Sequence, residues 1–243
     1  MVQAPRCAIA EWDSAFFGRR IGRLELERPV HADVAQAMAW AHEQALDCLY
    51  ALVDADARDS VRALERHGFE LMDVRLTLDR PVGDRDDPPS AGIEIGEPRP
   101  GDRDDLLALA RHSHRGTRFT EDPRFGAGRA GELYAAWLGN ALDEVDALVL
   151  VPREAGRAGG YLTLHRLREP VPHIGVLAVA PELQRRGVGR ALVGEGLRRA
   201  AARGAARVSV VTQGGNASAV RFYERCGFEA RRSQLWYHRW FTP

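Results

Sequence analysis

The sequence predicts a mixed α/β fold, in which crossover helices connect the strands of a sheet, and three observations predict it. Short apolar runs alternate with stretches of helical periodicity along most of the 243 residues. A glycine-rich turn joins an apolar run to an amphipathic stretch within residues 176–201. A ten-residue segment also occurs twice, each time between a predicted helix and a predicted strand. These features fit mixed α/β layers with crossover helices.

The first 80 residues alternate between strand and helix patterns. Strands are expected at 21–27, 48–53 and 70–78, and helices at 30–46 and 59–66. Gly68 ends the second helix. The apolar set of the last strand is Leu71, Val74, Leu76 and Leu78.

A polar, proline-rich stretch at 81–92 is the predicted linker between a segment at 1–80 and a larger one at 93–243. The larger segment again mixes the two patterns. Helices are expected at 104–111, 131–142, 188–203 and 217–226, and strands at 147–151, 161–167, 174–179, 207–212 and 229–239.

The repeated segment keeps one register in both copies. Residues 61–70 read Val-Arg-Ala-Leu-Glu-Arg-His-Gly-Phe-Glu and residues 220–229 read Val-Arg-Phe-Tyr-Glu-Arg-Cys-Gly-Phe-Glu, which are identical at seven of ten positions. We infer that the first segment is a degenerate copy of the second, with Leu64 where the second copy has Tyr223. Chance similarity between two amphipathic helices rich in Arg and Glu is the alternative.

Composition restricts the partners and the compartment. The formal net charge is zero, so no overall field draws the molecule to nucleic acid or to an anionic membrane. No apolar run approaches the roughly 18 residues of a membrane span, and the N-terminus lacks a signal-peptide core. The cysteines, Cys7, Cys48 and Cys226, form no metal-binding or disulfide pattern. We therefore expect a cytoplasmic protein without a bound metal, a nucleic-acid partner or a membrane partner.

The glycine-rich turn at residues 184–191 reads Gln-Arg-Arg-Gly-Val-Gly-Arg-Ala. Its glycines let the backbone bend tightly, and the helix that begins there directs unpaired amides and its positive dipole end into the same space. The turn therefore suits a diphosphate. It is no Walker loop, because the chain has no lysine, and no dinucleotide fingerprint, because Leu192 takes the third glycine position. An ordinary turn before a helix is the alternative.

The same turn resembles the acyl-CoA loop of the GCN5-related N-acetyltransferases (GNAT), whose pattern is Gln/Arg-x-x-Gly-x-Gly/Ala. Residues 216–228 read Asn-Ala-Ser-Ala-Val-Arg-Phe-Tyr-Glu-Arg-Cys-Gly-Phe, similar to the closing motif of that family, Asn-x-x-Ala-x-x-x-Tyr-x-x-x-Gly-Phe. The resemblance covers nearly all of residues 93–243. It implies an acyl-CoA N-acyltransferase fold there, preceded by a degenerate GNAT-like α/β segment, and direct acetyl transfer from acetyl-CoA to an amine in a ternary complex.

A narrower resemblance extends along the chain in patches. Residues 11–18, 118–119, 133–137 and 212–216 are similar to family members that acetylate the 4-amino group of a dTDP-linked 4-amino-4,6-dideoxygalactose. It implies a nucleotide-linked amino sugar as the acceptor. Two alternatives stay open: the same chemistry on another small amine, such as an antibiotic, a polyamine or an amino-acid derivative, and a non-catalytic CoA-binding regulator. A homodimer is an expectation from the family alone.

The family motifs imply contacts to acetyl-CoA residue by residue. They place the diphosphate on the backbone of the turn, and the thioester and pantetheine arm on the strand before it. Asn216 is also implied to hold the arm, and its alternative role is to cap its helix. The implied acetyl-CoA-binding residues are Leu177, Ala178, Val179, Gln184, Arg185, Arg186, Gly187, Val188, Gly189, Arg190, Ala191, Asn216 and Tyr223.

Acyl transfer from a thioester to an amine sets three catalytic tasks, of which the resemblance assigns the first. The backbone N–H of Val179 polarises the thioester carbonyl. Tyr223 is the general acid, because a phenol of pKa about 10 retains a proton for a thiolate whose conjugate acid has a pKa of about 8.5; a core tyrosine is the alternative. His173 is the candidate base, since histidine titrates near neutrality. Other candidates for the base are Glu121, His112, His114 and a chain of waters.

The stretch at residues 112–125 reads as a long irregular loop rich in Arg, hydroxyl groups and Phe. Long loops in compact domains often carry function, so we expect this one to bind the acceptor. Arg115 or Arg118 would contact phosphate, and Phe119 or Phe125 would stack on a base, with a solvated loop as the alternative. The candidate acceptor-binding residues are Arg115, Arg118, Phe119 and Glu121.

Overall fold

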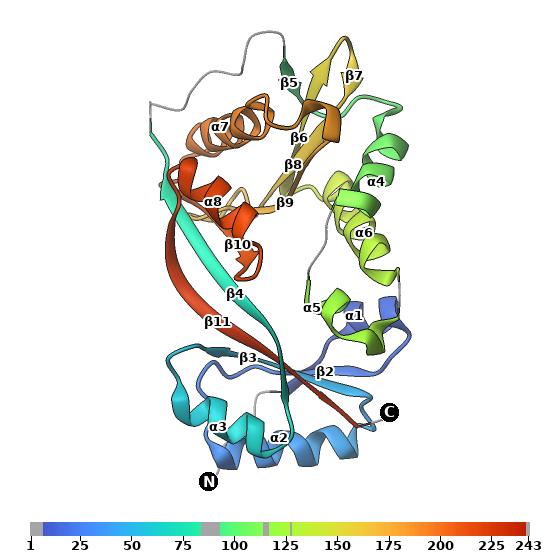
Figure 1. Ribbon diagram of the computed structural model, residues 1–243, viewed down its shortest axis with the longest axis vertical. Helices are drawn as coiled ribbons and strands as arrows, with labels where there is room; N and C mark the ends of the chain where they lie inside the picture. Colours follow the sequence, from blue (N-terminus) through green and yellow to red (C-terminus); the bar gives the residue numbers. More distant parts are fainter. Residues whose placement is uncertain (1–6, 84–92, 114–116, 127, 242–243) are drawn as a thin grey trace.

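The computed structural model describes residues 7–83, 93–113, 117–126 and 128–241, which form one continuous mixed sheet flanked by helices (Figure 1). The strands follow the order β1-β2-β3-β11-β4-β10-β9-β8-β6-β5, and β7 pairs with β6. The strands are β1 (Cys7–Ile9), β2 (Ile21–Leu24), β3 (Cys48–Asp54), β4 (Glu70–Pro81), β5 (Glu94–Gly96), β6 (Ala147–Glu154), β7 (Arg157–Ala158), β8 (Gly160–His165), β9 (His173–Val179), β10 (Arg207–Gln213) and β11 (Glu229–Trp240).

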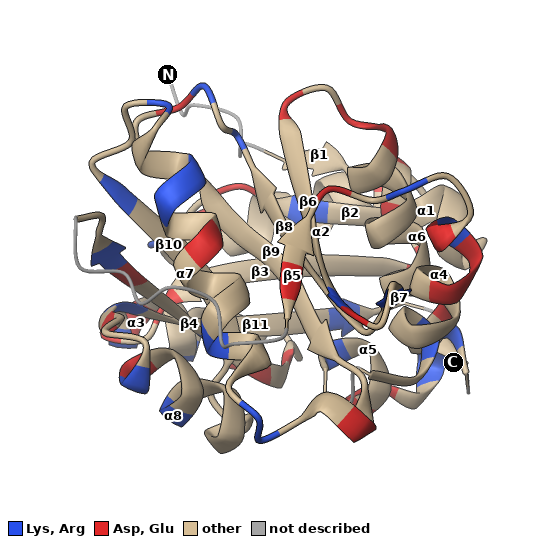
Figure 2. Cartoon of the chain, turned by 90° about the horizontal axis from the view of Figure 1, so that it is seen from above, with Lys and Arg blue, Asp and Glu red and all other residues tan. Residues whose placement is uncertain are grey.

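Helices cover both faces of this sheet, and two 3-10 turns complete the described elements. The helices are α1 (Glu11–Phe17), α2 (His31–Glu43), α3 (Arg58–Arg66), α4 (Asp102–Ser113), α5 (Arg118–Glu121), α6 (Arg129–Asp143), α7 (Val188–Ala201) and α8 (Ala217–Arg225), and the 3-10 turns are η1 (Pro123–Phe125) and η2 (Pro181–Leu183). No helix in these described ranges is long and apolar enough to cross a membrane. Basic and acidic residues are interspersed over the molecule (Figure 2).

The predicted mixed α/β fold is confirmed, and each expected helix and strand is present within a few residues of its expected bounds. The helix α1 and the short strands β1, β5 and β7 were not predicted. The stretch at 112–125 is also less irregular than expected, because α5 and η1 occupy much of it. Thr117 caps α5 by accepting the N–H of Phe119 at 3.3 Å, and Asp122 caps η1 by accepting the N–H of Arg124 at 3.2 Å.

The two parts of the chain exchange a strand. In the first segment, β4 follows α3, yet it lies between β10 and β11 of the second segment, and β11 in turn lies between β4 and β3. Figure 1 shows β4 and β11 as a long pair that connects the lobe of α2 and α3 with the lobe of α7 and α8. Each segment therefore supplies a strand to the other's part of the sheet. The boundaries 1–80, 81–92 and 93–243 stay a prediction.

The two copies of the repeat occupy equivalent places in the sheet. β2 and β3 are parallel, as are β9 and β10; β3 pairs antiparallel with β11, as β10 does with β4. Both copies also carry an irregularity at the same point of the repeat, because Met72 of β4 and Arg231 of β11 each lack a partner across the β4–β11 ladder. The inferred internal repeat thus has a structural counterpart in β2-α2-β3-α3-β4 and β9-α7-β10-α8-β11.

Leu71, one member of the expected apolar set of β4, is not buried as Leu78 is. Leu78 is fully buried between the sheet and α8, whereas Leu71 is 50% exposed. Leu71 lies beyond the irregularity at Met72 and lines an open pocket rather than the core. The expectation that it packs with Val74, Leu76 and Leu78 is therefore wrong.

Separate apolar clusters hold the elements around the site. One cluster packs α7 and α8 onto β8, β9 and β10, and a second packs α4 and α6 onto β6, β8 and β9. A third, aromatic cluster joins the two lobes. Its buried members are Phe17, Ile21, Cys48, Tyr50, Phe119, Phe125, Leu133 and Trp240. Burial of such side chains is worth roughly 1.5–3 kcal/mol each, so the lobes are firmly held against each other.

Candidate active site

A gap opens in the sheet between the parallel strands β9 and β10. Their pairing is limited to the first rungs, at His173 and Ile174 of β9. Beyond these rungs β9 continues to Val179 and β10 to Gln213 without facing each other as partners. Two strand edges with unused hydrogen-bonding groups therefore border the gap.

The alternation of the strand decides which amides of β9 face this gap. On the side of β9 that faces β8, the N–H of Val176 donates to the Thr163 hydroxyl at 3.0 Å, and the N–H of Ala180 donates to the carbonyl of Gly159, just before β8, at 2.9 Å. Neighbouring residues of a strand present their polar groups to opposite sides, so the N–H groups of Leu177 and Val179 face the gap. By the same alternation the N–H of Ala178 faces β8.

The glycine-rich turn lies directly after β9 and begins α7. The Gln184 side-chain amide donates to the Val179 carbonyl at 2.9 Å and fixes the turn to the end of the strand. Gly187, with φ of 81°, precedes the first residue of α7 and gives the helix no side-chain cap. The first amides of a helix have no partner within it, so they stay available to a ligand.

Close packing of α7 on α8 explains the second glycine of the turn. A Cβ on Gly189 would lie 3.3 Å from the ring of Phe222. Val188 and Ala191 pack into the core and are buried. Arg186 forms an ion pair with Glu154 of β6, and its Nη1 donates to that carboxylate at 3.1 Å.

A cavity of about 610 Å³ lies at the gap, and elements from both lobes line it. The β9, β10 and α8 side contributes the predicted Leu177, Asn216 and Tyr223. The opposite side comes from α5, α6, β4 and β11. The lining residues are Asp73, Arg75, Thr117, Arg118, Phe119, Tyr134, Trp137, Asn140, His165, His173, Ile174, Gly175, Val176, Leu177, Val211, Thr212, Gln213, Asn216, Ala219, Tyr223 and Trp236.

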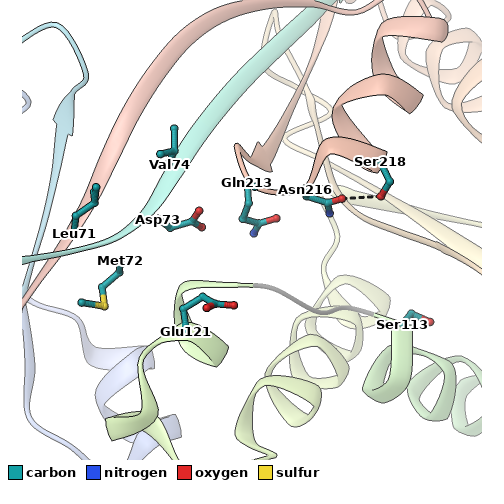
Figure 3. Close-up of a pocket in the computed structure, with 10 residues that line it drawn as sticks. Leu71, Met72, Asp73, Val74, Ser113, Glu121, Gln213, Asn216 and Ser218 are labelled. Atoms are coloured by element: carbon teal, nitrogen blue, oxygen red, sulfur yellow. Dashed lines mark hydrogen bonds between the residues drawn. The ribbon is translucent and has the colours of Figure 1, made fainter.

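A second pocket of about 690 Å³ shares Asp73, Gln213 and Asn216 with the cavity, so the two adjoin. In Figure 3 the side chains of Asp73, Gln213 and Glu121 extend into the space between β4, α5 and the start of α8. The volumes of the two together exceed what a single aliphatic amine requires.

Asn216 and Tyr223 lie on the same helix and reach the same cavity. Asn216 is the N-cap of α8, because its Oδ1 accepts the N–H of Ala219 at 3.1 Å and the hydroxyl of Ser218 at 2.9 Å. Tyr223 is buried between Phe222 and Phe228, and burial raises its pKa. Its phenol therefore keeps its proton at neutral pH and can donate it.

Asp73 of β4 brings a carboxylate from the degenerate segment into the cavity. Burial raises the pKa of Asp73 to about 6, against the lowering effects of the Val74 amide and the Arg118 charge. Such a carboxylate is ionised at neutral pH and is a better proton acceptor than an ordinary aspartate. The sequence alone did not predict a catalytic role for Asp73.

His173 lies in the cavity wall and stacks on His165, with ring centroids 5.2 Å apart. Burial and the neighbouring His165 lower the pKa of His173 to about 4. A neutral imidazole of this pKa is a weak acceptor for the proton of an alkyl ammonium. His112 of α4 is exposed, and its Nδ1 lies 2.9 Å from the Ala108 carbonyl.

The candidates for acceptor binding fall into different environments. Phe119 is 4% exposed within the aromatic cluster, Arg118 lies beside it in the cavity wall, and Glu121 is exposed at the adjoining pocket. Phe125 is buried in the same aromatic cluster as Phe119. Arg115 and His114 lie outside the described residues. In those residues no group of three or more His, Cys, Asp or Glu side chains gathers as a metal site.

At the equivalent place in the degenerate lobe, partly exposed side chains form ion pairs. The repeat matches Asp73 with Arg232 and Gln213 with Asp54. Arg232 pairs with Glu27 and Asp54, and Asp54 also pairs with Arg28 at 3.1 Å. Leu64 also stands in the place of Tyr223, so the described residues of the degenerate lobe offer no equivalent of the acid at this position.

Further cavity residues were missed because they come together only through strand exchange. Asp73 and Trp236 share one rung of the β4–β11 ladder, and Arg75 lies two rungs away. Tyr134 of α6 forms a hydrogen bond with Gln213 of β10. The available signal was a pair of charged residues, Asp73 and Arg75, inside a predicted strand. Charged residues at one face of an interior strand need a partner or a ligand.

Comparison with known proteins identifies the fold and the family. Residues 112–228 match the acetyltransferase (GNAT) family. A GCN5-related N-acetyltransferase from Sphaerobacter thermophilus shares the fold, with a TM-score of 0.69 at 15% identity over 99% of this chain and 78% of that chain.

Three relatives are similar in sequence. The dTDP-fucosamine acetyltransferase of Escherichia coli O6:H1 is 30% identical over 94% of this chain and 95% of that protein. The spore coat polysaccharide biosynthesis protein SpsD of Bacillus subtilis is 32% identical, over 61% of this chain and 51% of that protein. The mycothiol acetyltransferase of Tsukamurella paurometabola is 30% identical over 90% of this chain and 73% of that protein. The chain belongs to the GNAT family and is an N-acetyltransferase.

Proposed function

We propose that this N-acetyltransferase transfers the acetyl group of acetyl-CoA to the amine of a nucleotide-linked amino sugar, by direct attack in a ternary complex. One observation carries the proposal. The gap between β9 and β10, which is bordered by the glycine-rich turn, opens into a cavity that contains both Tyr223 and Asp73. A thioester arm in the gap and an amine in the cavity would meet between an acid and a base.

The donor is proposed to bind along the turn and the open edge of β9. The amides at the start of α7 and the positive end of its dipole would hold the diphosphate, with charge added by Arg185 and Arg190. The Leu177 and Val179 amides that face the gap would hold the pantetheine arm and the thioester carbonyl. A preorganised amide of this kind is worth about 3–4 kcal/mol in a dry site.

The chemistry is then a single displacement with two proton transfers. The ammonium of the acceptor gives a proton to the Asp73 carboxylate, and the free amine attacks the thioester carbonyl. The Val179 amide stabilises the developing oxyanion. When the carbon–sulfur bond breaks, Tyr223 protonates the leaving thiolate, which is then released as CoA. We favour Asp73 over His173 as the base because the higher pKa of Asp73 makes it the stronger proton acceptor.

Two observations support the proposed acceptor. One is how much of the chain matches a single relative, and the other is the set of residues that line the cavity. The match to dTDP-fucosamine acetyltransferase includes the degenerate segment, which supplies Asp73. On the acceptor side the cavity offers the rings of Trp137 and Trp236 and the amide of Asn140. Aromatic faces and amides suit the C–H and hydroxyl groups of a sugar. The similarity to mycothiol acetyltransferase makes an acceptor outside the sugar nucleotides the competing proposal.

The test is acetyl transfer by the purified protein. Acetyl-CoA is mixed with dTDP-4-amino-4,6-dideoxygalactose, its 4-hydroxy analogue or an amine unrelated to sugars, and the products are identified by mass spectrometry. We expect one acetyl group on the 4-aminosugar nucleotide, equimolar release of CoA and no transfer to the hydroxy analogue. Faster acetylation of the unrelated amine would overturn the acceptor proposal.

A further inference from the structure

Arg118 is a half-buried cation enclosed by aromatic rings. Its guanidinium carbon lies 4.0 Å from the ring centre of Trp236, 4.2 Å from that of Phe119 and 4.4 Å from that of Tyr50. Burial lowers its pKa. Among the described residues no carboxylate lies within 4.0 Å of it. Arginine at this depth normally has an anionic partner, because desolvation of a charge is costly.

A chain of hydrogen bonds fixes one end of this guanidinium. Arg118 Nη1 lies 3.0 Å from Nε2 of His238 and must donate to it, because arginine accepts no hydrogen bond. His238 is therefore neutral and donates from Nδ1 to Asp122 at 2.8 Å. The Trp240 ring N–H donates to the same carboxylate oxygen at 2.8 Å. This relay is fully buried, so it holds Arg118 in one orientation without neutralising it.

The other donors of Arg118 have no acceptor among the described residues, while the residue lines the cavity. Arginine has five N–H donors, and only one of them is used by His238. Aromatic faces stabilise the charge but satisfy few of these donors. The hydroxyl of Tyr50, which lies against Arg118, is buried without a hydrogen-bond partner, whereas the remaining donors of Arg118 open onto the cavity. Polar groups of this kind point to a missing ligand.

A second arginine lines the same cavity. Arg75 of β4 donates to the Gln234 amide at 2.6 Å and, like Arg118, has no carboxylate within 4.0 Å in the described part of the chain. Burial lowers its pKa, and the nearby Arg232 and Arg23 lower it further. Arg75 lies two rungs from the Asp73–Trp236 pair, with the Val74–Leu235 rung between them. Two cations that have no carboxylate within 4.0 Å among the described residues thus line the cavity together with the proposed base, although Asp13 acts on Arg118 and Glu27 on Arg75 over longer distances.

We propose that Arg118 and Arg75 form a subsite for a diphosphate carried by the acceptor. This inference rests on the proposed function, of which it specifies the acceptor. Two guanidiniums suit a diphosphate better than a single carboxylate, because each can donate two parallel hydrogen bonds to it. The His238–Asp122 relay positions Arg118, and Trp236 lies under the site. The acceptor is accordingly selected by its charge as well as by its amine.

Direct binding tests this subsite without relying on acetyl transfer. Thymidine diphosphate is titrated into the intact protein in the presence of saturating CoA, which occupies the diphosphate site of the turn, and binding is followed by calorimetry. Thymidine, which lacks the diphosphate and its charge, is the control ligand. We expect thymidine diphosphate to bind about tenfold or more tightly than thymidine, because charge-assisted hydrogen bonds contribute most of the difference. Equal affinities would overturn the proposal.

Variants assign the effect to the two arginines. Arg118→Gln and Arg75→Gln should each weaken thymidine diphosphate about tenfold or more and leave thymidine unchanged, whereas Arg118→Lys should retain part of the affinity. Arg62→Gln removes an equal charge from the exposed face of α3 and should change neither affinity. CoA binding and melting temperature establish that each variant is folded. Unchanged diphosphate affinity in both cavity variants would refute the subsite, while the failure of the wild-type protein to bind CoA would refute the proposed function instead.

Discussion

Arg75 and Gln234 are equivalent residues of the two repeats, 159 positions apart, and they are paired with each other at the centre of the sheet. Their side chains form a hydrogen bond of 2.6 Å, and their backbones share one rung of the β4–β11 ladder. On either side of this rung, Leu76 pairs with Ser233 and Val74 pairs with Leu235. The repeat relates these two rungs to each other, because Leu76 corresponds to Leu235 and Val74 to Ser233. A pseudo-twofold axis therefore passes through this pair, and it relates the active lobe to the degenerate one.

The strand exchange around this axis predicts that residues 93–243 do not fold alone. Without residues 1–92, β10 and β11 lose their shared neighbour β4, and both strands expose an open edge. The Leu78 side chain, fully buried against α8, is lost with it. We expect the fragment to be aggregated or largely unfolded by circular dichroism and by NMR. A soluble fragment that shows cooperative unfolding and binds CoA would contradict this prediction.

Asp73→Asn should remove the acid limb of the pH profile. In the wild-type protein kcat/KM should fall as the pH drops through about 6, because Asp73 accepts a proton only as a carboxylate and its pKa is raised to that value. The variant should be about a hundredfold slower at pH 7 and should lack this limb. Glu121→Gln changes an exposed carboxylate at the adjoining pocket and should retain the limb. An unchanged limb in Asp73→Asn would exclude Asp73 as the base.

Tyr223→Phe should lower turnover about tenfold or more, because the thiolate then leaves without a proton donor. CoA affinity should stay close to that of the wild-type protein, since the ring that packs between Phe222 and Phe228 is kept. Tyr237→Phe is the matched control. It removes a hydroxyl that donates to Glu65 at 3.1 Å in the other lobe, and its turnover should be unchanged. Stopped-flow measurement of CoA release separates the two variants, and full turnover in Tyr223→Phe would remove this tyrosine from the mechanism.

Gly187→Ala should weaken CoA binding as well as stability. Gly187 has φ of 81°, where a Cβ costs about 1–2 kcal/mol, and relief of this strain would turn the amides at the start of α7. Gly204 has φ of 86° with open space around it, so Gly204→Ala bears a similar strain away from the site. Both variants should melt earlier, but only Gly187→Ala should bind CoA more weakly by calorimetry. Equal CoA affinities would show that the turn does not hold the cofactor.

The elements were predictable because each carries its own local signal. The Gly-Phe junctions after α3 and α8, the apolar run of β9 and the glycine-rich turn each specify structure within about ten residues of themselves. The short helix α5 was missed although Thr117 marks its start. Its four residues are too few to show a helical period.

The site was less predictable, because half of it depends on pairing between distant strands. Nothing local to Asp73 indicates that β4 lies beside β10, and Trp236 reaches the cavity only through its rung with Asp73. The roles of the turn, Asn216 and Tyr223 follow from motifs and stay predictions until a ligand is bound. The cytoplasmic location and the homodimer likewise remain predictions from the sequence.

A crystal structure of the protein with CoA tests the central claim most directly. The account predicts the pyrophosphate on the amides between Gln184 and Ala191, the pantetheine arm in the gap between β9 and β10, and the sulfur within hydrogen-bonding distance of the Tyr223 hydroxyl. A pyrophosphate bound elsewhere, or a Tyr223 hydroxyl directed away from the sulfur, would contradict it.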